Sequence, residues 1–346
     1  MSDTRSPLRL GGRMPGIFLA LFGERAPRLP KEMEFFVTLW PDFPHFDKFA
    51  GETRLSGIRL NSAMIDLPEL DRGLDIIRAR AAVALYFDIK GRQLRVTQVH
   101  EDPENLIISL NHPVAVATPA AVLFKAGSDG AVLDRIEENG HRLVFRGVPR
   151  YTVNPGESLQ IRHPSLRVGG KQFTPLELEK LERVKQAGFT HYFLSYVQSQ
   201  RDVDEFRELV GRDSQIMLKI EDQAGLEYVA REFKKDDQLR LVAAQGDLYV
   251  EVARPYDILS ALKLIIEHDP EANVASRMML SIDDERRMLL SMDGQPVPSC
   301  ADFQQIAWLY DIGYRSFMLC DEICLKDELL SPALNALYAF KDNYAH

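Results

Sequence analysis

The feature that most constrains this chain is a short apolar run with two opposite charges inside it, MLKIED at 217–222. The run has the length and composition of a buried strand, and successive side chains of a strand point to opposite faces. Lys219 and Glu221 therefore share one face, and Leu218 and Ile220 share the other. Because an unpaired buried charge is costly, the charged face either holds a buried ion pair or lines a site. The run by itself leaves both interpretations open.

A second run, VAAQGDLYVEV at 242–252, favours a site. Its strand stops before Gly246, which lets backbone amides approach a ligand where a short helix can begin. Such a turn can hold a carboxylate or a phosphate on its amides while Asp247 turns toward a metal. The carboxylates of Glu221 and Asp247, together with the ammonium of Lys219, predict a divalent-metal site that handles phosphate.

Composition argues against several classes of protein. The net charge of −9 argues against a nucleic-acid-binding surface, which is normally basic. No stretch approaches the ~20 apolar residues of a membrane span, and the run GIFLALF at 16–22 is too short for the core of a signal peptide. The cysteines, Cys300, Cys320 and Cys324, have no paired metal spacing. We therefore expect core thiols, no zinc site and a cytoplasmic location.

Apolar runs alternate with helical patterns along the chain, which favours a parallel sheet with crossover helices. A helix is expected over 175–186, because Thr174 can cap it and Pro175 suits its first position, and another over 255–267. Strands and helices in this alternation predict an α/β fold, a TIM (β/α)8 barrel over residues 31–95 and 171–346. The eight strands are expected at 36–39, 57–61, 83–88, 192–196, 216–220, 240–244, 273–275 and 316–319.

Two segments fall outside this alternation. Residues 96–170 are dense in Gly, Pro, Asn and Asp and contain short runs of Val, Ile and Leu. That composition predicts a small β-rich subdomain inserted into the barrel. Residues 1–30 are basic and rich in Gly and Pro, so we expect a loose N-terminal arm.

On these runs the chain resembles the pyruvate kinase family. KIED at 219–222 is similar to the family's K-I-E-N strand, and AQGDLYVE at 244–251 is similar to A-R-G-D-L-G-V-E. FMLCDE at 317–322 is similar to A-V-M-L-S-G-E. Further similar runs occur in the family's order: EFFVTLWP (34–41), IRLN (58–61), FDIKGRQLR (87–95), FLSYVQ (193–198) and VASRMMLS (274–281). The resemblance implies a barrel that binds phosphoenolpyruvate and pyruvate, with a trimmed β lid at 96–170.

The resemblance also implies which residues hold cations. Glu221 and Asp247 would hold Mg²⁺, or Mn²⁺ in its place, since Mg²⁺ takes one or two protein carboxylates. Lys219 would stabilise the enolate and the phosphoryl group in transfer. Asn61 and Asp88 would offer oxygens to K⁺, as a weaker candidate site.

A set of substrate contacts follows from the same resemblance. Backbone amides and a hydroxyl would bind the carboxylate of phosphoenolpyruvate or pyruvate, two guanidinium groups would clamp phosphate, and an ammonium would lie close by. The amides are those of Gly246 and Asp247, and the hydroxyl is that of Ser276. The guanidinium groups are those of Arg59 and Arg95, and the ammonium is that of Lys90. Without the resemblance, Arg59, Arg95, Lys90, Asp88 and Ser276 could have ordinary structural roles, such as a surface charge, a turn cap or a small residue between its neighbours.

The chain departs from the family pattern mainly on the nucleotide side. Ala63 and Met64 stand where the family has Ser and His, which removes one K⁺ ligand and one nucleotide contact. Gln245 replaces the Arg before Gly-Asp, and Tyr249 replaces a Gly. The chain also ends soon after its eighth strand, so we expect the regulatory C-terminal domain of the family to be absent.

Three functions stay open at this point. The first is a divergent pyruvate kinase that moves the phosphoryl group of phosphoenolpyruvate to ADP, giving pyruvate and ATP with Mg²⁺. The second is a Mg²⁺-dependent lyase or aldolase that forms the enolate of pyruvate and has lost the nucleotide site. The third is a non-catalytic binding protein. The oligomeric state is also open, with a homo-oligomer among the alternatives.

Overall fold

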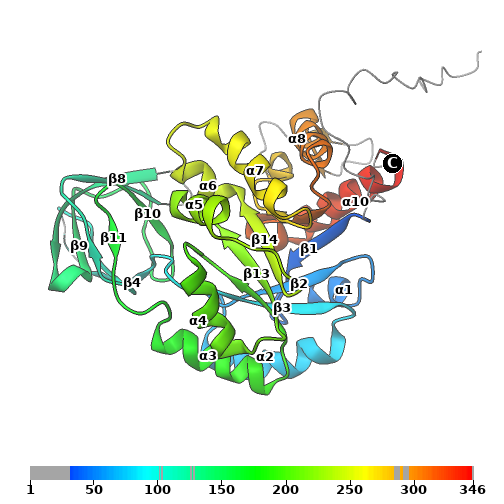
Figure 1. Ribbon diagram of the computed structural model, residues 1–346, viewed down its shortest axis with the longest axis horizontal. Coiled ribbons are helices and arrows are strands. Elements are labelled where there is room, and N and C mark those ends of the chain that lie inside the picture. Colours follow the sequence, from blue (N-terminus) through cyan, green and yellow to red (C-terminus); the bar gives the residue numbers. More distant parts are fainter. Residues whose placement is uncertain are drawn as a thin grey trace, which may run out of the picture. The chain divides into compact units, whose positions relative to one another are not determined.

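Eight parallel strands close into a barrel in the computed structural model (Figure 1). The structure describes residues 32–100, 102, 104–124, 127, 129–283, 289–290 (backbone only) and 296–344, so the predicted arm at 1–30 lies outside the described residues. The predicted TIM barrel is confirmed, with each strand at or within a few residues of its expected place. In chain order the barrel strands are β1 (Glu34–Thr38), β2 (Gly57–Asn61), β3 (Ala84–Ile89), β12 (His191–Leu194), β13 (Gln215–Ile220), β14 (Leu239–Ala244), β15 (Asn273–Ala275) and β18 (Ser316–Met318).

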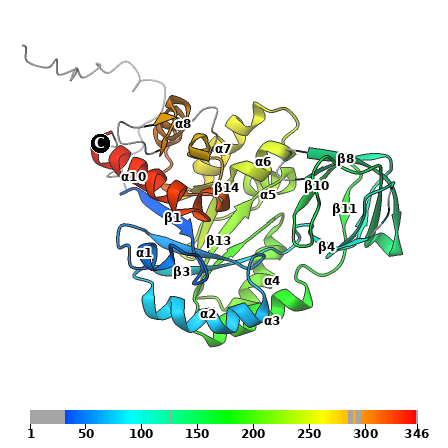
Figure 2. The ribbon, with the colours of Figure 1, turned by 180° about the vertical axis from the view of Figure 1, so that it is seen from behind.

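Helices surround the barrel, as Figures 1 and 2 show from opposite sides. The predicted helix over 175–186 is confirmed, because the Thr174 side chain accepts a hydrogen bond from the Glu177 amide (3.2 Å) and Pro175 occupies the first turn. The helix expected at 255–267 begins two residues later. The helices are α1 (Phe46–Ala50), α2 (Leu67–Arg80), α3 (Pro175–Gln186), α4 (Gln200–Val210), α5 (Gln223–Arg231), α6 (Gln245–Glu251), α7 (Asp257–His268), α8 (Cys300–Asp311), α9 (Asp321–Cys324) and α10 (Asp327–Asn343), with 3₁₀ turns η3 (Glu138–Gly140) and η4 (Leu280–Asp283).

The two faces of β13 have the predicted division of side chains. Leu218 and Ile220 belong to the large apolar core that joins the strands to the outer helices. Met217 points the other way, into a small apolar cluster with residues of other barrel strands. Because side chains alternate along a strand, Lys219 and Glu221 continue the Met217 face toward the carboxyl end of the barrel.

An antiparallel sheet follows β3, with its own apolar core. All of its strands lie within the predicted insertion at 96–170, while the division of the chain into domains at those residues stays a prediction. The six-stranded sheet has the order β10-β7-β8-β9-β5-β4, and β11 pairs with β6. The strands of the six-stranded sheet are β4 (Val96–His100), β5 (Ile107–Leu110), β7 (Ala120–Phe124), β8 (Asp129–Glu137), β9 (Arg142–Arg146) and β10 (Leu159–Arg162). Two further pairs are β6 (Val114–Ala115) with β11 (Arg167–Val168), and β16 (Leu289–Leu290) with β17 (Pro296–Val297), which precedes α8.

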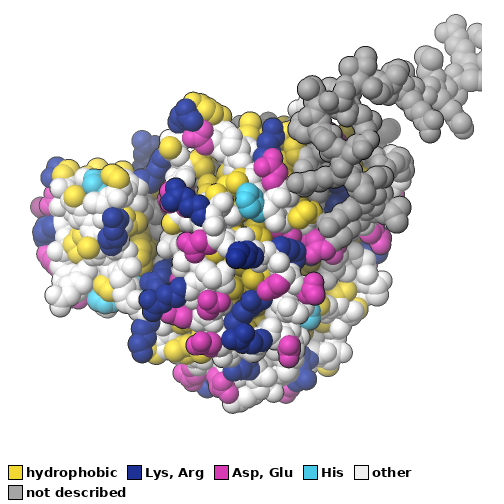
Figure 3. All heavy atoms as spheres, viewed as in Figure 1, with side chains coloured by type: hydrophobic (Ala, Val, Ile, Leu, Met, Phe, Trp, Pro, Cys, Tyr) yellow, Lys and Arg dark blue, Asp and Glu magenta, His cyan; other side chains and the backbone are white. Residues whose placement is uncertain are grey.

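The surface drawn in Figure 3 has basic and acidic side chains interspersed, with no continuous basic stripe on that face. Within the described part of the chain, no helix has both the length and the apolar character needed to cross a membrane.

Candidate active site

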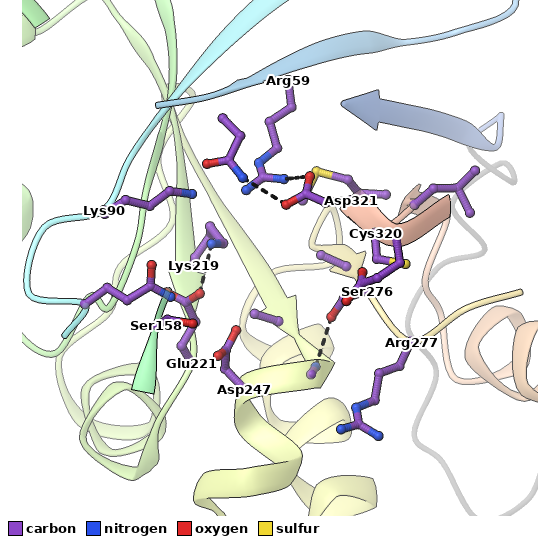
Figure 4. Close-up of a pocket in the computed structure, with 18 of the residues that line it drawn as sticks. Arg59, Lys90, Ser158, Lys219, Glu221, Asp247, Ser276, Arg277, Cys320 and Asp321 are labelled. Carbon is purple, nitrogen blue, oxygen red and sulfur yellow. Dashed lines mark hydrogen bonds and ion pairs between the residues drawn. The ribbon is translucent and has the colours of Figure 1, made fainter. Parts of the chain in front are cut away.

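Polar side chains at the carboxyl ends of the barrel strands line a cavity of about 670 Å³ (Figure 4). This end of the barrel is where (β/α)8 enzymes place their chemistry. All the predicted site residues line the cavity except Asp88, which is fully buried and contacts three of them. Those in the lining are Arg59, Asn61, Lys90, Arg95, Lys219, Glu221, Gly246, Asp247 and Ser276.

Lys219 and Glu221 form an ion pair that faces this cavity. Lys219 Nζ lies 2.9 Å from Glu221 Oε1 and donates a hydrogen bond to Ser195 Oγ (2.9 Å). Asp88 Oδ2 is 3.8 Å away. Burial lowers the pKa of Lys219, but the charges of Asp88 and Glu221 outweigh burial and raise it. The two interpretations that the sequence left open therefore describe one feature, a buried ion pair in the wall of a site.

Glu221 is held by the backbone of the neighbouring strand end. Its Oε2 accepts a hydrogen bond from the Tyr196 amide (2.6 Å), and Tyr196 adopts a φ of 52°, a left-handed conformation that is uncommon for a bulky residue. Burial and the nearby charge of Asp247 raise the pKa of Glu221 to about 7, against the opposing charge of Lys219. Its Oε1 has the ion pair but makes no hydrogen bond. This carboxylate is thus oriented and under-satisfied.

Asp247 lies in the first turn of α6, which begins directly after β14 as the Gly-Asp turn predicted. The amide of Gly246 donates to Ser276 Oγ (2.9 Å), and a Cβ at Gly246 would come within 3.0 Å of that oxygen. A larger residue at position 246 would therefore crowd the Ser276 hydroxyl and require it to shift. The predicted carboxylate-binding amide of Gly246 already has a partner in this conformation, so a ligand carboxylate would have to replace the Ser276 hydroxyl there.

Ser276 sits on a strained turn after β15. Ser276, Arg277 and Met279 all have positive φ values, of 62°, 53° and 60°. Non-glycine residues pay for this conformation with about 1–3 kcal/mol each, and such strain concentrates at functional sites. The turn directs the Ser276 side chain toward the start of α6, where Figure 4 shows it beside the cavity.

The donor set of the cavity fits Mg²⁺. The carboxylates of Glu221 and Asp247 are among those that line it, and Glu221 Oε1 is a buried acceptor without a hydrogen bond. Among the described residues, no group of three or more His, Cys, Asp or Glu is arranged to hold a metal. A closed site of protein ligands, as Zn²⁺ prefers, is therefore not formed by these residues. Two carboxylates with room for water and substrate oxygens suit Mg²⁺.

Arg59, the predicted phosphate clamp, is held by two carboxylates. Its Nε and Nη2 lie 2.8 Å and 2.6 Å from Asp88 Oδ2. Its Nη1 donates to Asp321 Oδ1 (2.7 Å) and to Thr38 Oγ1 (3.0 Å). Burial opposes the charge of Arg59, but Asp321 and Asp88 outweigh it and raise its pKa. The guanidinium is therefore well ordered and already paired.

The predicted K⁺ ligands also have protein partners. Asp88 Oδ1 accepts from Ser195 Oγ (3.1 Å), and its Oδ2 contacts Arg59 and the Lys90 ammonium (2.7 Å). Asn61 Nδ2 donates to Asp321 Oδ2 (2.8 Å). Burial lowers the pKa of Lys90 to about 7, with nearby cations adding to the effect and Asp88 opposing it. The K⁺ site stays a prediction, and the oxygens that Asp88 and Asn61 would offer already accept hydrogen bonds from Ser195, Lys90 and the Ala63 amide.

Arg95 reaches the cavity from the segment that joins β3 to the inserted sheet. Its Nη2 donates to Gln93 Oε1 and its Nη1 to the Gly156 carbonyl, while its Nε is buried without a hydrogen bond. Burial lowers the pKa of Arg95 against the pull of the nearby carboxylates. The open Nε leaves this guanidinium with capacity to bind an anion.

Two of the residues that sequence reasoning missed make direct contacts with predicted site residues. Asp321 follows the last barrel strand, so the rule that identified Asp247, a polar residue just after a buried strand, could have found it. Gln160 lies on β10 and donates from Nε2 to Asp247 Oδ1 (3.0 Å). No local signal marks Gln160, because its contact spans 87 positions of the chain.

Together these features define a (β/α)8 barrel with a pocket lined by charged side chains at the carboxyl ends of its strands and an antiparallel sheet inserted after the third strand. Residues 160–324 match the family model for the barrel domain of pyruvate kinase. Over these residues the chain is similar to the pyruvate kinase family.

Two relatives show how far the likeness extends. The chain is 22% identical over 307 residues to the pyruvate kinase of Methanocaldococcus jannaschii, covering 84% of this chain and 65% of that protein. It is 30% identical over 149 residues to the pyruvate kinase of Agrobacterium vitis, covering 43% of this chain and 29% of that protein. The chain thus spans less than two thirds of the length of these curated relatives.

Proposed function

We propose that this protein is a Mg²⁺-dependent transferase that moves the phosphoryl group of phosphoenolpyruvate to ADP. The observation that carries the proposal is the meeting of Lys219, Glu221 and Asp247 in one cavity, with Ser276 on its wall. These residues come from the ends of three barrel strands. The match to the family model and the similarity to curated pyruvate kinases support the same reaction.

In the proposed reaction the P–O bond of phosphoenolpyruvate breaks, a terminal oxygen of ADP bonds to phosphorus, and the enolate left behind takes a proton to give pyruvate. Glu221 and Asp247 would hold Mg²⁺, which when bound neutralises charge on the phosphoryl and enolate oxygens. Lys219 would place its ammonium against the same developing negative charge. Fixed charges of this kind are the main means of catalysing phosphoryl transfer.

The second function, an enzyme that forms the enolate of pyruvate without a nucleotide, is favoured by specific observations. Asp321 already occupies one edge of Arg59, where a phosphoryl group would bind. Gln245, at the position of a family Arg, is tied to the Ser276 carbonyl (3.0 Å) and to Gln305 (3.1 Å). Tyr249 is 43% exposed, and the Arg277 guanidinium lies 4.9 Å from its ring centre. The nucleotide side is thus the part least like the family.

A non-catalytic binding role ranks third, because it leaves the oriented, under-satisfied Glu221 without a purpose. A homo-oligomer and a cytoplasmic location remain predictions from the sequence.

The test is pyruvate production from phosphoenolpyruvate, ADP and Mg²⁺, with and without K⁺. We expect turnover in the wild type and a loss of at least about 10²–10³-fold in kcat for Lys219→Met, the range for removing one preorganised electrostatic group. Asp247→Ala should lose activity and Mg²⁺ dependence together. Lys263→Met, on the exposed face of α7, is the matched control and should retain wild-type rates.

Other outcomes separate the alternatives. No turnover, with Mg²⁺-dependent binding of oxalate or pyruvate retained, would favour the enolate-forming enzyme. If neither ligand binds in the presence of Mg²⁺, the site assignment is wrong and the non-catalytic role gains support.

A further inference from the structure

Asp321 is a carboxylate that pairs with Arg59, the predicted phosphate clamp, and so could compete there with a phosphoryl group. It begins α9 directly after β18, and its side chain, 30% exposed, lines the cavity. Its Oδ1 lies 2.7 Å from Arg59 Nη1, and its Oδ2 accepts from Asn61 Nδ2 (2.8 Å). Both oxygens of this carboxylate are therefore engaged with groups of the pocket wall, as Figure 4 shows.

The pairing uses the part of Arg59 that faces the cavity. The Nε and Nη2 atoms of Arg59 are turned to Asp88, which is fully buried, so they are directed away from any ligand in the cavity. The remaining nitrogen, Nη1, is shared by Thr38 and Asp321. A guanidinium offers five N–H donors in a fixed fork, and here its ligand-facing edge is filled by the protein.

Charge adds to this steric competition. A phosphoryl group carries nearly two negative charges, and at Arg59 it would meet the carboxylate of Asp321 as well as that of Asp88. Like charges at close range repel, so binding there requires Asp321 to leave Arg59 or become neutral. A carboxylate ligand at Ser276 and the metal ligands would not meet this obstacle, because Asp321 has no contact with those residues among the described interactions.

We infer that Asp321 is a specificity-determining residue that occupies the phosphate-binding edge of Arg59 and so disfavours phosphorylated ligands relative to unphosphorylated 2-oxo acids. The inference rests on the proposed function, since it uses the same pocket for the carboxylate and the metal. It assigns the substrate preference of that pocket: small dianions such as oxalate and the enolate of pyruvate bind readily, and phosphoenolpyruvate binds only with displacement of Asp321.

The experiment compares two ligands in one pocket. Dissociation constants for phosphoenolpyruvate and for oxalate are measured calorimetrically with saturating Mg²⁺ in the wild type, in Asp321→Asn and in Asp321→Gly. The glycine variant is included because an asparagine amide would face the Nδ2 group of Asn61. It also introduces the residue of the family's A-V-M-L-S-G-E run at this position. Thermal melting of each variant verifies that it is folded.

We expect either substitution to tighten phosphoenolpyruvate binding about tenfold or more, the scale of one charge-assisted hydrogen bond regained by Arg59, while oxalate binding changes less than about threefold. Asp321→Glu keeps the charge and should retain most of the discrimination. Glu322→Gln removes an exposed neighbouring charge that has no contact with Arg59 among the described interactions, and it should shift both ligands equally.

The inference is overturned if the ratio of the two dissociation constants is unchanged in both variants, or if phosphoenolpyruvate binds more weakly. It is also overturned if neither ligand binds to any variant, because the pocket is then misassigned. Failure of the proposed phosphotransfer is a separate result. A protein without turnover can still be tested for the role of Asp321, because that test uses only the ratio of the two dissociation constants.

Discussion

The side-chain amide of Gln160, on the inserted sheet, donates a hydrogen bond to Asp247 Oδ1 at 3.0 Å. Gln160 is 3% exposed, and its own Oε1 has no hydrogen-bond partner. A second bond, from Arg162 Nη2 to the Val252 carbonyl (3.3 Å), joins β10 to the end of α6. The inserted sheet therefore contacts a proposed metal ligand directly, and we expect this contact to orient the Asp247 carboxylate.

Replacing Gln160 with leucine should weaken Mg²⁺ binding. Asp247 would lose the donor that orients its carboxylate, and removal of such supporting bonds lowers metal affinity by about 10–100-fold. The measurement is the Mg²⁺ dissociation constant, from calorimetry or from the Mg²⁺ dependence of Tm.

The matched control is Arg162→Met, which removes the other bond between β10 and α6 without touching Asp247. We expect its Mg²⁺ affinity to equal that of the wild type. An equal loss in both variants would show instead that general contact with the inserted sheet matters, and an unchanged Gln160→Leu would show that Asp247 is oriented without it.

Asp88→Asn should strongly destabilise the fold. Asp88 is fully buried among Arg59, Lys90 and Lys219, and its neutralisation leaves three cations without the carboxylate that separates them. Breaking a buried ion pair in this way costs about 3–5 kcal/mol. The free energy of unfolding in urea at about pH 7 measures the loss.

The loss should depend on pH with a defined sign. Burial raises the pKa of Asp88, but Lys219, Lys90 and Arg59 outweigh it and hold the pKa well below its ordinary value. A lowered pKa in the folded state contributes stability above about pH 4, and that contribution disappears as the pH falls through the folded pKa. The difference between wild type and Asp88→Asn should therefore be constant from neutral to weakly acidic pH and shrink below about pH 4.

The control for Asp88 is Asp71→Asn, which removes an exposed ion pair with Arg183 and should change stability little. A similar effect of the two substitutions would contradict the proposed importance of the buried charge network.

Glu251→Gln should stabilise the protein at alkaline pH. Burial and the charges of Asp222 and Asp247 raise the pKa of Glu251 to about 7, against the opposing charge of Arg162. Ionisation of Glu251 is disfavoured in the folded state, so its charge lowers the stability of the fold. This loss of stability is absent below the unfolded pKa of about 4.3, grows between that pH and about pH 7, and is constant above about pH 7. Allowing for partial exposure, we expect a gain of about 1–2 kcal/mol at pH 8 and almost none at pH 4.5.

Urea unfolding of metal-free protein at both pH values tests this expectation. Glu227→Gln, an exposed position on α5, is the control and should show no pH-dependent gain. If Glu251→Gln and the wild type are equally stable at both pH values, the pKa of Glu251 in the folded protein is not raised.

Local sequence was a sufficient guide to the barrel elements. The apolar runs located the eight strands, and Thr174 with Pro175 located the start of α3, because side-chain alternation and helix capping act over a few residues. The same alternation placed Lys219 and Glu221 on one face of β13. The carboxyl ends of neighbouring parallel strands meet at one end of a barrel, so the place of the site followed as well.

The partners of these side chains lie far away in the chain and could not be deduced locally. Asp321 contacts Arg59 across 262 positions, and Gln160 contacts Asp247 across 87. Composition and periodicity carry no information on which charge meets which, because pairing depends on barrel closure and on how the inserted sheet meets α6. The residue types of the site could therefore be predicted from the sequence. Closure of the barrel decided their partners: Arg59 pairs with two carboxylates, and the Gly246 amide bonds to Ser276.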